Sequence, residues 1–216
     1  MKKVVLAYSG GLDTTYCVKY LGDLGYEVHA VLVDTGGFSE DELAFVEKRA
    51  STIGVASYKA IRVTNKFYDN CIKYLIFGNI LKNNTYPLSV SAERIFQAVA
   101  IAQYAKELGA DAIAHGSTGA GNDQVRFDMA FHIIYPQAEI ITPIRDNNLT
   151  RQEEIDFLTK HGVEGDWSKA EYSINKGIWG TSVGGRETLT SDQFLPEDAF
   201  PSQIQKTDSE EVVLTF

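Results

Sequence analysis

Cysteine is scarce in this sequence, and the two cysteines that it has lie far apart. Cys17 and Cys71 both fall in segments whose apolar spacing is typical of helices. A zinc site or a redox pair needs cysteine and histidine at short, fixed spacings, which this pattern does not offer. Free cysteines usually behave as small apolar side chains, so we expect both thiols to be buried.

Basic residues and long apolar runs are also lacking. The 20 Lys and Arg against 29 Asp and Glu give a net charge of −9, without any Lys/Arg run, which argues against a nucleic-acid partner. The apolar run after Met1 is too short for a signal peptide or a membrane span. The four histidines are scattered. We expect a soluble, cytoplasmic protein with no nucleic-acid or membrane partner and no metal-ligand cluster of its own.

What the sequence does contain is an alternation of strand and helix patterns. Buried strands are predicted at residues 4–8 and 28–33, further strands at 57–63, 112–115 and 140–142, and helices at 13–24, 40–53, 66–81, 92–108 and 151–161. Ser39 with Glu42, and Thr150 with Glu153, form capping boxes. This alternation predicts an α/β fold with a parallel, Rossmann-like sheet that binds ligands at the carboxyl ends of its strands.

The pattern changes after Gly162. Residues 163–216 contain two tryptophans, several glycines and scattered polar residues, with no strong helix. Residues 211–216 (EVVLTF) read as a strand, which needs a neighbouring strand to pair with. We therefore expect a nucleotide-binding domain over residues 1–165, and the incomplete beginning of a second, α+β domain over residues 166–216.

A glycine turn follows the first strand at Ser9-Gly10-Gly11. Glycines let backbone N–H groups converge on one point, and the helix that follows adds the positive end of its dipole, so this turn suits a phosphate group. The hydroxyls of Ser9, Thr14 and Thr15 can donate to phosphate oxygens. The plainer alternative is a tight turn in which Asp13 or Thr14 caps the helix. The loop has no lysine and is not a Walker A loop.

A second glycine loop, residues 115–126 (HGSTGAGNDQVR), is denser in polar groups. Arg126 can clamp a carboxylate through two hydrogen bonds, and Asp123 can pair with an ammonium group. Together these groups suit a zwitterionic amino acid. The plainer alternative is a polar surface loop in which Asn122 or Asp123 caps a helix.

Both loops resemble known signatures. Residues 7–14 (AYSGGLDT) resemble the ATP pyrophosphatase, or PP-loop, superfamily, and residues 115–127 (HGSTGAGNDQVRF) resemble the argininosuccinate synthase family within it. Residues 86–88 (YPL) and the Tyr-Ser-Ile and Ile-Trp-Gly-Thr-Ser runs within residues 172–182 support this resemblance. It implies an enzyme of arginine biosynthesis that joins citrulline to aspartate through a citrullyl-adenylate, with release of AMP and pyrophosphate.

The resemblance also implies site residues. ATP would be bound by Ala7, Tyr8, Ser9, Gly10, Gly11, Leu12, Asp13, Thr14, Thr15, Val33 and Gly116. Aspartate would be bound by Thr118, Asn122 and Asp123, and citrulline by Tyr86, Ser91, Asn122, Arg126, Ser173 and Ser182. Asp13, Asp123 and Arg126 form the candidate catalytic set. Catalysis would rest on positioning and charge stabilisation, with Mg²⁺ carried mainly by the phosphates.

The sequence also departs from the family pattern. Ala120 stands where the family usually has lysine, and Glu93 places a carboxylate in a stretch that usually reads Gly-Thr-Ser-Leu-Ala-Arg. Family chains are roughly twice as long and form homotetramers, so further citrulline contacts and the oligomerisation helix are expected beyond Phe216. Two alternatives stay open. One is another PP-loop adenylating enzyme, such as a tRNA-modifying adenylyltransferase. The other is a nucleotide-binding fragment without complete activity.

Overall fold

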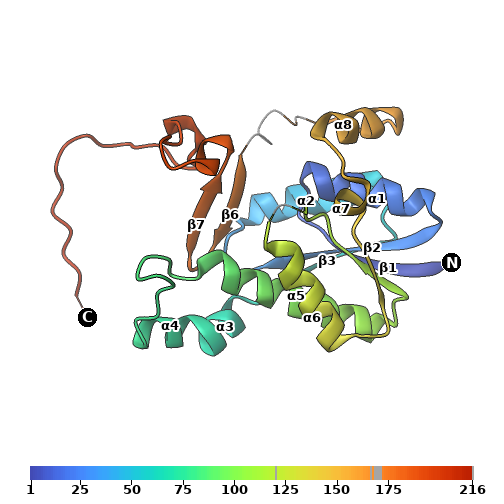
Figure 1. The fold of residues 1–216 in the computed structure, drawn as a ribbon, viewed down its shortest axis with the longest axis horizontal. Helices are drawn as coiled ribbons and strands as arrows, with labels where there is room; N and C mark the ends of the chain where they lie inside the picture. Colours follow the sequence, from blue (N-terminus) through green and yellow to red (C-terminus); the bar gives the residue numbers. More distant parts are fainter. Residues whose placement is uncertain (120, 166, 168–171, 216) are drawn as a thin grey trace.

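Five parallel strands form one sheet in the order β3-β2-β1-β4-β5 (Figure 1). This computed structural model describes residues 1–119, 121–165, 167 and 172–215. The strands are β1 (Lys2–Ala7), β2 (Tyr26–Asp34), β3 (Ser57–Arg62), β4 (Ala112–Ala114) and β5 (Glu139–Ile141). β1 lies at the centre, with Val4 beside Val28 on β2 and beside Ala112 on β4. The predicted α/β fold is confirmed.

Helices cover both faces of the sheet. One face packs against α1 (Leu12–Asp23), α2 (Glu40–Ile53), α7 (Pro143–Asn147) and α8 (Arg151–Lys160). The other face packs against α5 (Ser89–Leu108) and α6 (Asp123–Ile134). Alternate residues of β1 divide between the two cores, because successive strand side chains point to opposite faces: Val4 and Leu6 join one core and Val5 the other. Both predicted capping boxes are present, at Ser39 and at Thr150. Among the described helices, none is long and apolar enough to cross a membrane.

Beyond β3 the chain forms three consecutive helical pieces: α3 (Thr64–Phe67), the π-helical η1 (Tyr68–Ile72) and α4 (Lys73–Phe77). The prediction of one helix over residues 66–81 was wrong about its regularity and its end. The helix stops at Gly78, and Asn79 then takes a positive φ of 46°. Cys71 lies in the π-helical turn and is half-buried rather than buried, whereas Cys17 is fully buried as predicted.

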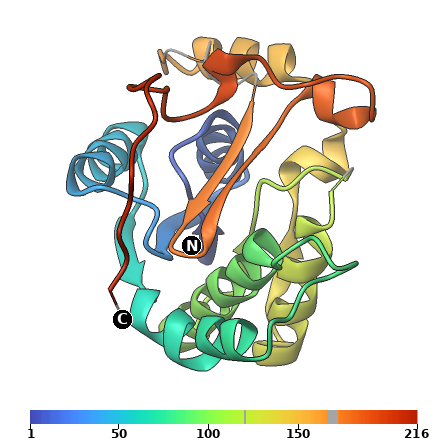
Figure 2. The same cartoon turned by 90° about the vertical axis from the view of Figure 1, so that its left-hand side faces the viewer.

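An antiparallel hairpin, β6 (Ser173–Gly177) and β7 (Gly180–Gly184), follows α8 and lies across the carboxyl-end edge of the sheet, between α2 and α5 (Figure 2). Two short 3₁₀ turns, η3 (Arg186–Leu189) and η4 (Glu197–Ala199), come next. The strand predicted at residues 211–216 was wrong. Residues 211–215 are exposed and pair with no described strand, and an apolar segment forms a strand only where a partner completes its hydrogen bonds. Phe216 lies outside the described residues. The domain boundary at residue 165 stays a prediction.

Candidate functional site

A cleft of about 670 Å³ lies at the carboxyl ends of the central strands, the usual place for a ligand in such a sheet. Both glycine loops, the ends of β1 and β2, the start of α5 and strand β6 all contribute to its walls. A second cleft, of about 620 Å³, lies over β3 and α5 and contains none of the predicted site residues. The geometry therefore favours the cleft at the strand ends.

The first glycine loop leads β1 directly into α1. Gly10 takes a φ of +76°, which favours glycine, and its carbonyl oxygen accepts a hydrogen bond from Arg49 Nη1 at 2.5 Å. Gly11 is the N-cap residue, and no side chain caps the helix. The alternative in which Asp13 or Thr14 caps α1 was therefore wrong. With no side-chain cap, the first N–H groups of α1 face the cleft side of the loop, an arrangement that suits an anion.

The loop's hydroxyls bond to each other. Thr14 Oγ1 lies 3.3 Å from Ser9 Oγ and 3.4 Å from the N–H of Ser9, and the Gly11 N–H donates to Ser9 Oγ at 3.4 Å. These are long, weak bonds that a stronger acceptor can replace. Thr15, by contrast, is fully buried behind the loop and does not line the cleft.

Asp13 lies beside a second carboxyl group on α8. Glu154 is 2% exposed, and its carboxyl group interacts with that of Asp13 where α8 packs on α1. Burial, followed by the nearby charge of Asp13, raises the pKa of Glu154 to about 8. Burial also raises the pKa of Asp13, although the positive charge of Arg151 opposes this shift. At neutral pH burial and the closeness of the two carboxyl groups favour one proton held by the pair.

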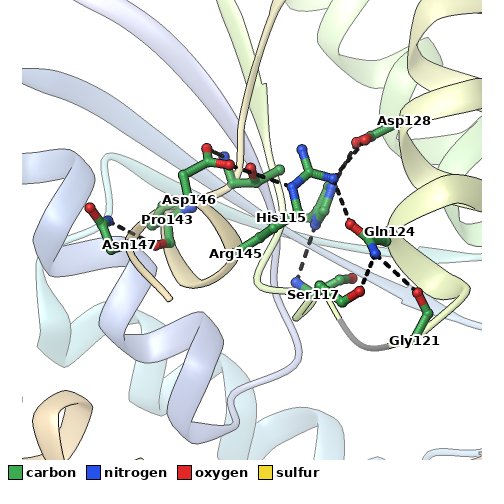
Figure 3. A network of polar contacts seen from close by, with 11 residues as sticks. His115, Ser117, Gly121, Gln124, Asp128, Pro143, Arg145, Asp146 and Asn147 are labelled. Atoms are coloured by element: carbon green, nitrogen blue, oxygen red, sulfur yellow. Dashed lines mark hydrogen bonds and ion pairs between the residues drawn. The ribbon is translucent and has the colours of Figure 1, made fainter. Parts of the chain in front are cut away.

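The second glycine loop rests on a buried histidine (Figure 3). His115 is 1% exposed; its Nδ1 accepts from the Ser117 N–H at 3.2 Å, and its Nε2 lies 2.9 Å from Asp128 Oδ1. This pattern places the imidazole proton on Nε2. Burial lowers the pKa of His115 even though Asp128 opposes the shift, so the ring stays neutral and shapes the loop.

Arg145 of α7 fixes the other side of this loop (Figure 3). Its Nη1 donates to Asp128 Oδ2 at 2.8 Å and to Gln124 Oε1 at 3.0 Å. Gln124 in turn donates to the carbonyl oxygens of Gly119, at 2.6 Å, and Gly121, at 3.3 Å. These exposed and partly buried polar contacts tie Gly119 and Gly121 of the loop to α6 and α7.

The two loops touch each other inside the cleft. A Cβ atom at Gly116 would lie 3.3 Å from Asp13 Cβ and 3.5 Å from Thr14 Cγ2. The absence of a side chain at Gly116 therefore allows the second loop to approach the start of α1. A ligand that binds one loop is within reach of the other.

Asp123, in the first turn of α6, is held by two guanidinium groups. Its Oδ1 accepts from Arg126 Nη1 at 2.7 Å, and its Oδ2 accepts from Arg94 Nε at 3.1 Å. Asn122 is the N-cap residue of α6, as the surface-loop alternative expected, but its side chain makes no cap bond. Asp123 and Arg94 line the cleft, and Arg126 adjoins it through its bond to Asp123.

The β6–β7 hairpin docks on this site through hydrogen bonds to main-chain carbonyl oxygens, one donated by its backbone and one by a side chain. The Ile178 N–H donates to Thr35 O at 3.0 Å, and Trp179 Nε1 donates to Pro87 O at 2.7 Å. Gly37 lies so close to Lys176 that a Cβ atom at position 37 would overlap the Lys176 carbonyl oxygen. The loop after β2 and the hairpin therefore meet backbone to backbone.

Most of the predicted residues gather around this cleft. Those that line it are Ala7, Tyr8, Ser9, Gly11, Leu12, Asp13, Thr14, Val33, Gly116, Thr118, Asp123 and Ser173. Gly10, Thr15, Asn122 and Arg126 adjoin it through their loops and helices, and Ser182 pairs with Asn175 across the hairpin. Tyr86 and Ser91 lie together at the start of α5, where Tyr86 Oη accepts from the Ser91 N–H at 3.1 Å. Ala120 lies outside the described residues.

Several cleft residues were not predicted. Glu93, Arg94, Gln97, Arg151, Asn175 and Lys176 line the cleft as well. Glu93 had been noted only as a departure from a family pattern; it is buried, and burial raises the pKa of its carboxyl group. The capping box at Thr150 could have located Arg151 at the start of a helix, and this signal was not used to predict a cleft residue. Among the residues that the structure describes, no three His, Cys, Asp or Glu side chains are arranged to hold a metal ion.

Comparisons of this chain with a family model and with curated proteins agree with one another. A family model described as "Arginosuccinate synthase N-terminal HUP domain" matches residues 3–164. The chain is 42% identical over 199 residues to the argininosuccinate synthase of Sulfurisphaera tokodaii, covering 92% of this chain and 50% of that protein. It is 40% identical over 216 residues to the same enzyme of Sulfolobus acidocaldarius, with coverages of 99% and 55%. For the Methanocaldococcus jannaschii enzyme the identity is 42% over 197 residues, with coverages of 91% and 49%. The chain thus spans about half the length of the curated relatives that it matches.

Proposed function

Because this chain belongs to the argininosuccinate synthase family, we propose that it binds ATP, citrulline and aspartate in the cleft at the strand ends and forms argininosuccinate. The citrulline ureido oxygen attacks the α-phosphorus of ATP, and pyrophosphate leaves. The aspartate amine then attacks the ureido carbon, and AMP leaves. Both nucleophiles belong to substrates, so the protein needs no nucleophile of its own.

The observation that carries this proposal is the contact between the two glycine loops. The first loop offers the N-terminal N–H groups of α1 to phosphate oxygens, and Gly116 lies against Asp13 and Thr14. This arrangement lets the second loop present Thr118 and Asp123 to an amino acid near the phosphates. The protein then accelerates the reaction by holding the reactants in line and by stabilising charge on the phosphate.

Mg²⁺ accompanies ATP in this proposal. Mg²⁺ prefers oxygen ligands and is commonly held by substrate phosphates with one or two carboxylates. Asp13 lines the cleft, and among the described residues no three His, Cys, Asp or Glu side chains gather to hold a metal ion; this donor set fits an ion carried mainly by the phosphates. Its chemistry would be to neutralise charge on the leaving pyrophosphate.

The experiment that tests the proposal is citrulline-dependent exchange of labelled pyrophosphate into ATP by the 216-residue chain, without aspartate. Exchange reports the first half-reaction alone. Addition of aspartate should then yield argininosuccinate and AMP in equal amounts, measured by mass spectrometry. Exchange without citrulline would indicate a different adenylating enzyme on the same fold.

A second candidate is a nucleotide-binding fragment without complete activity. It is favoured by the coverage, because about half of each relative has no counterpart in this chain. ATP binding measured by calorimetry, with no citrulline-dependent exchange, would support the fragment. With the ligase function we also propose the cytoplasmic location and the homotetrameric assembly that are expected from the family. Light scattering after gel filtration measures the assembly directly.

A further inference from the structure

Arg94 contacts three separate elements of the cleft. Its Nε donates to Asp123 on α6 at 3.1 Å, its Nη1 donates to Gln97 on α5 at 2.7 Å, and its Nη2 donates to Asn175 Oδ1 on β6. The side chain is 19% exposed, so these bonds are sheltered from water. Each guanidinium nitrogen meets a different acceptor, a task for which the planar arginine fork is suited and a lysine ammonium group is not.

Neighbouring groups on α5 hold this guanidinium in place. Gln97 accepts from Arg94 through Oε1 and donates through Nε2 to Glu93 Oε1 at 2.8 Å. Glu93 is 4% exposed, and its Oε1 lies 3.6 Å from Arg94 Nη1. Two carboxylates, Glu93 and Asp123, therefore balance the two guanidinium groups of Arg94 and Arg126. A charge-balanced, hydrogen-bonded group of this kind tolerates burial.

The partners of Arg94 lie on two sides of the proposed amino-acid site. Asp123 is the proposed partner of the aspartate ammonium group, and Asn175 lies opposite Ser182 and two residues after Ser173, the two proposed citrulline contacts on the hairpin. An isolated two-stranded hairpin is at best marginally stable in water, so the position of β6 depends on what it docks against. Arg94 supplies a side-chain contact in the middle of β6, while the turn is held at Thr35 and Pro87.

We propose that Arg94 is a positioning residue that orients Asp123 and holds the β6–β7 hairpin, so that the two amino-acid sites keep a fixed distance from each other. It acts through Asp123 and Asn175 and touches no reacting atom. The part that concerns the substrates rests on the function proposed above. The part that concerns the hairpin rests on the contacts alone.

The hairpin part is tested by hydrogen–deuterium exchange with mass spectrometry on the full 216-residue chain. In Arg94→Ala, amides of residues 173–184 should exchange about 10-fold faster, since loss of a hydrogen bond to a charged group corresponds to roughly this factor or more. Exchange in β1 should not change. Asn175→Leu should reproduce the effect, and Asn175→Asp, which keeps an acceptor for Arg94, should preserve the parent rate. Lys73→Ala, which removes a cation paired with Asp69 away from this cleft, is the matched control.

The substrate part is tested by separate titrations with ATP, citrulline and aspartate. Arg94→Ala should raise the KM of both amino acids by about 10-fold or more while the Kd of ATP stays within about 2-fold. Asn175→Leu should raise the KM of citrulline alone. Arg94→Lys, which keeps the charge but not the fork, should resemble Arg94→Ala rather than the parent chain.

Two results would overturn the proposal. One is unchanged exchange of residues 173–184 in Arg94→Lys and Asn175→Leu, two variants chosen in case Arg94→Ala does not fold. The other is parent-like kinetics in Arg94→Lys. If the parent chain binds no amino acid, the proposed function fails, but the exchange measurements still decide whether Arg94 holds the hairpin.

Discussion

Gly10 is the residue on which the first loop depends most directly. Its φ of +76° is unfavourable for any side chain, and a Cβ atom there would lie 3.0 Å from Val46 Cγ2. Gly10→Val should therefore distort the loop and weaken ATP binding by at least about 10-fold, as measured by calorimetry. Gly22→Ala is a suitable control, because a Cβ atom at Gly22 meets nothing within 4 Å. Parent-like ATP affinity in Gly10→Val would remove this loop from the nucleotide site.

Asp123 gives a second prediction at the scale of one residue. Asp123→Ala removes the proposed partner of the aspartate ammonium group and leaves Arg94 and Arg126 without their shared carboxylate. The KM of aspartate should rise by about 10- to 100-fold, the usual cost of losing a charged hydrogen-bond partner, while the Kd of ATP stays within about 2-fold. Steady-state kinetics with each substrate varied in turn measure both values. An unchanged aspartate KM would exclude Asp123 from the amino-acid site.

Single residues differed in how far they could be predicted. The residues of the two glycine loops could be predicted, because closely spaced glycines and hydroxyl side chains indicate a ligand-binding loop within a few positions of the sequence. Arg94 and Glu154 could not be predicted, because nothing near them in the sequence shows that they meet Asp123 and Asp13. Their importance depends on helix packing, since Glu154 reaches Asp13 only where α8 lies on α1.

The packing of α8 on α1 predicts how stability depends on pH. Glu154 has a pKa of about 8 in the folded chain against 4.5 in the unfolded chain, so the folded chain holds its proton more tightly. The unfolding free energy should therefore fall as pH rises from about 4.5 to about 8, on the order of 3 kcal/mol, and then level off. In Glu154→Gln, which cannot titrate, this decline should be much smaller. Urea denaturation at a series of pH values measures it.

Several charged and titratable groups surround Glu154, so the pH experiment needs a control variant at a carboxylate outside this group. Asp13, Tyr16 and Cys17 face it from α1, and Arg151 faces it from its own helix. Glu153→Gln alters a neighbouring but exposed carboxylate on the same helix, so it should leave the decline between pH 4.5 and 8 intact. Identical pH profiles for the parent chain and Glu154→Gln would contradict a shared proton between Glu154 and Asp13.

Strands and helix caps could be predicted where the sequence pattern that specifies them spans only a few residues. The five strands of the sheet and both capping boxes were predicted, because apolar runs and cap residues act within a few positions. The hairpin was missed, since β6 and β7 contain three glycines and few apolar residues and gain their place by docking on Thr35 and Pro87. The prediction of a strand at residues 211–216 was wrong although the composition of this segment favours a strand. The described chain supplies no partner strand for residues 211–215.

For the molecule as a whole, the tail contributes little to the folded body. Residues 201–215 are exposed throughout and run as an extended thread beyond the hairpin (Figure 1). Deletion of residues 201–216 should change the Tm by no more than about 2 °C, because almost no buried surface is lost. Differential scanning calorimetry of the full and shortened chains measures this difference. A much lower Tm in the shortened chain would show that the tail packs on the body. Deletion from residue 173, which also removes the hairpin, is the comparison expected to lower the Tm.

The docking of the hairpin also has a consequence for the order in which the protein is made. The described residues that hold the hairpin, from Thr35 and Gly37 to Pro87 and Arg94, are synthesised at least 79 residues before β6 begins at Ser173. Since a growing chain emerges from the ribosome N-terminus first and folds in units as it emerges, the sheet can be finished while the hairpin is still inside the exit tunnel. The last wall of the cleft is therefore added to a template that already exists, and a chain released after a stop codon just before residue 173 should already form the sheet and the open floor of the cleft.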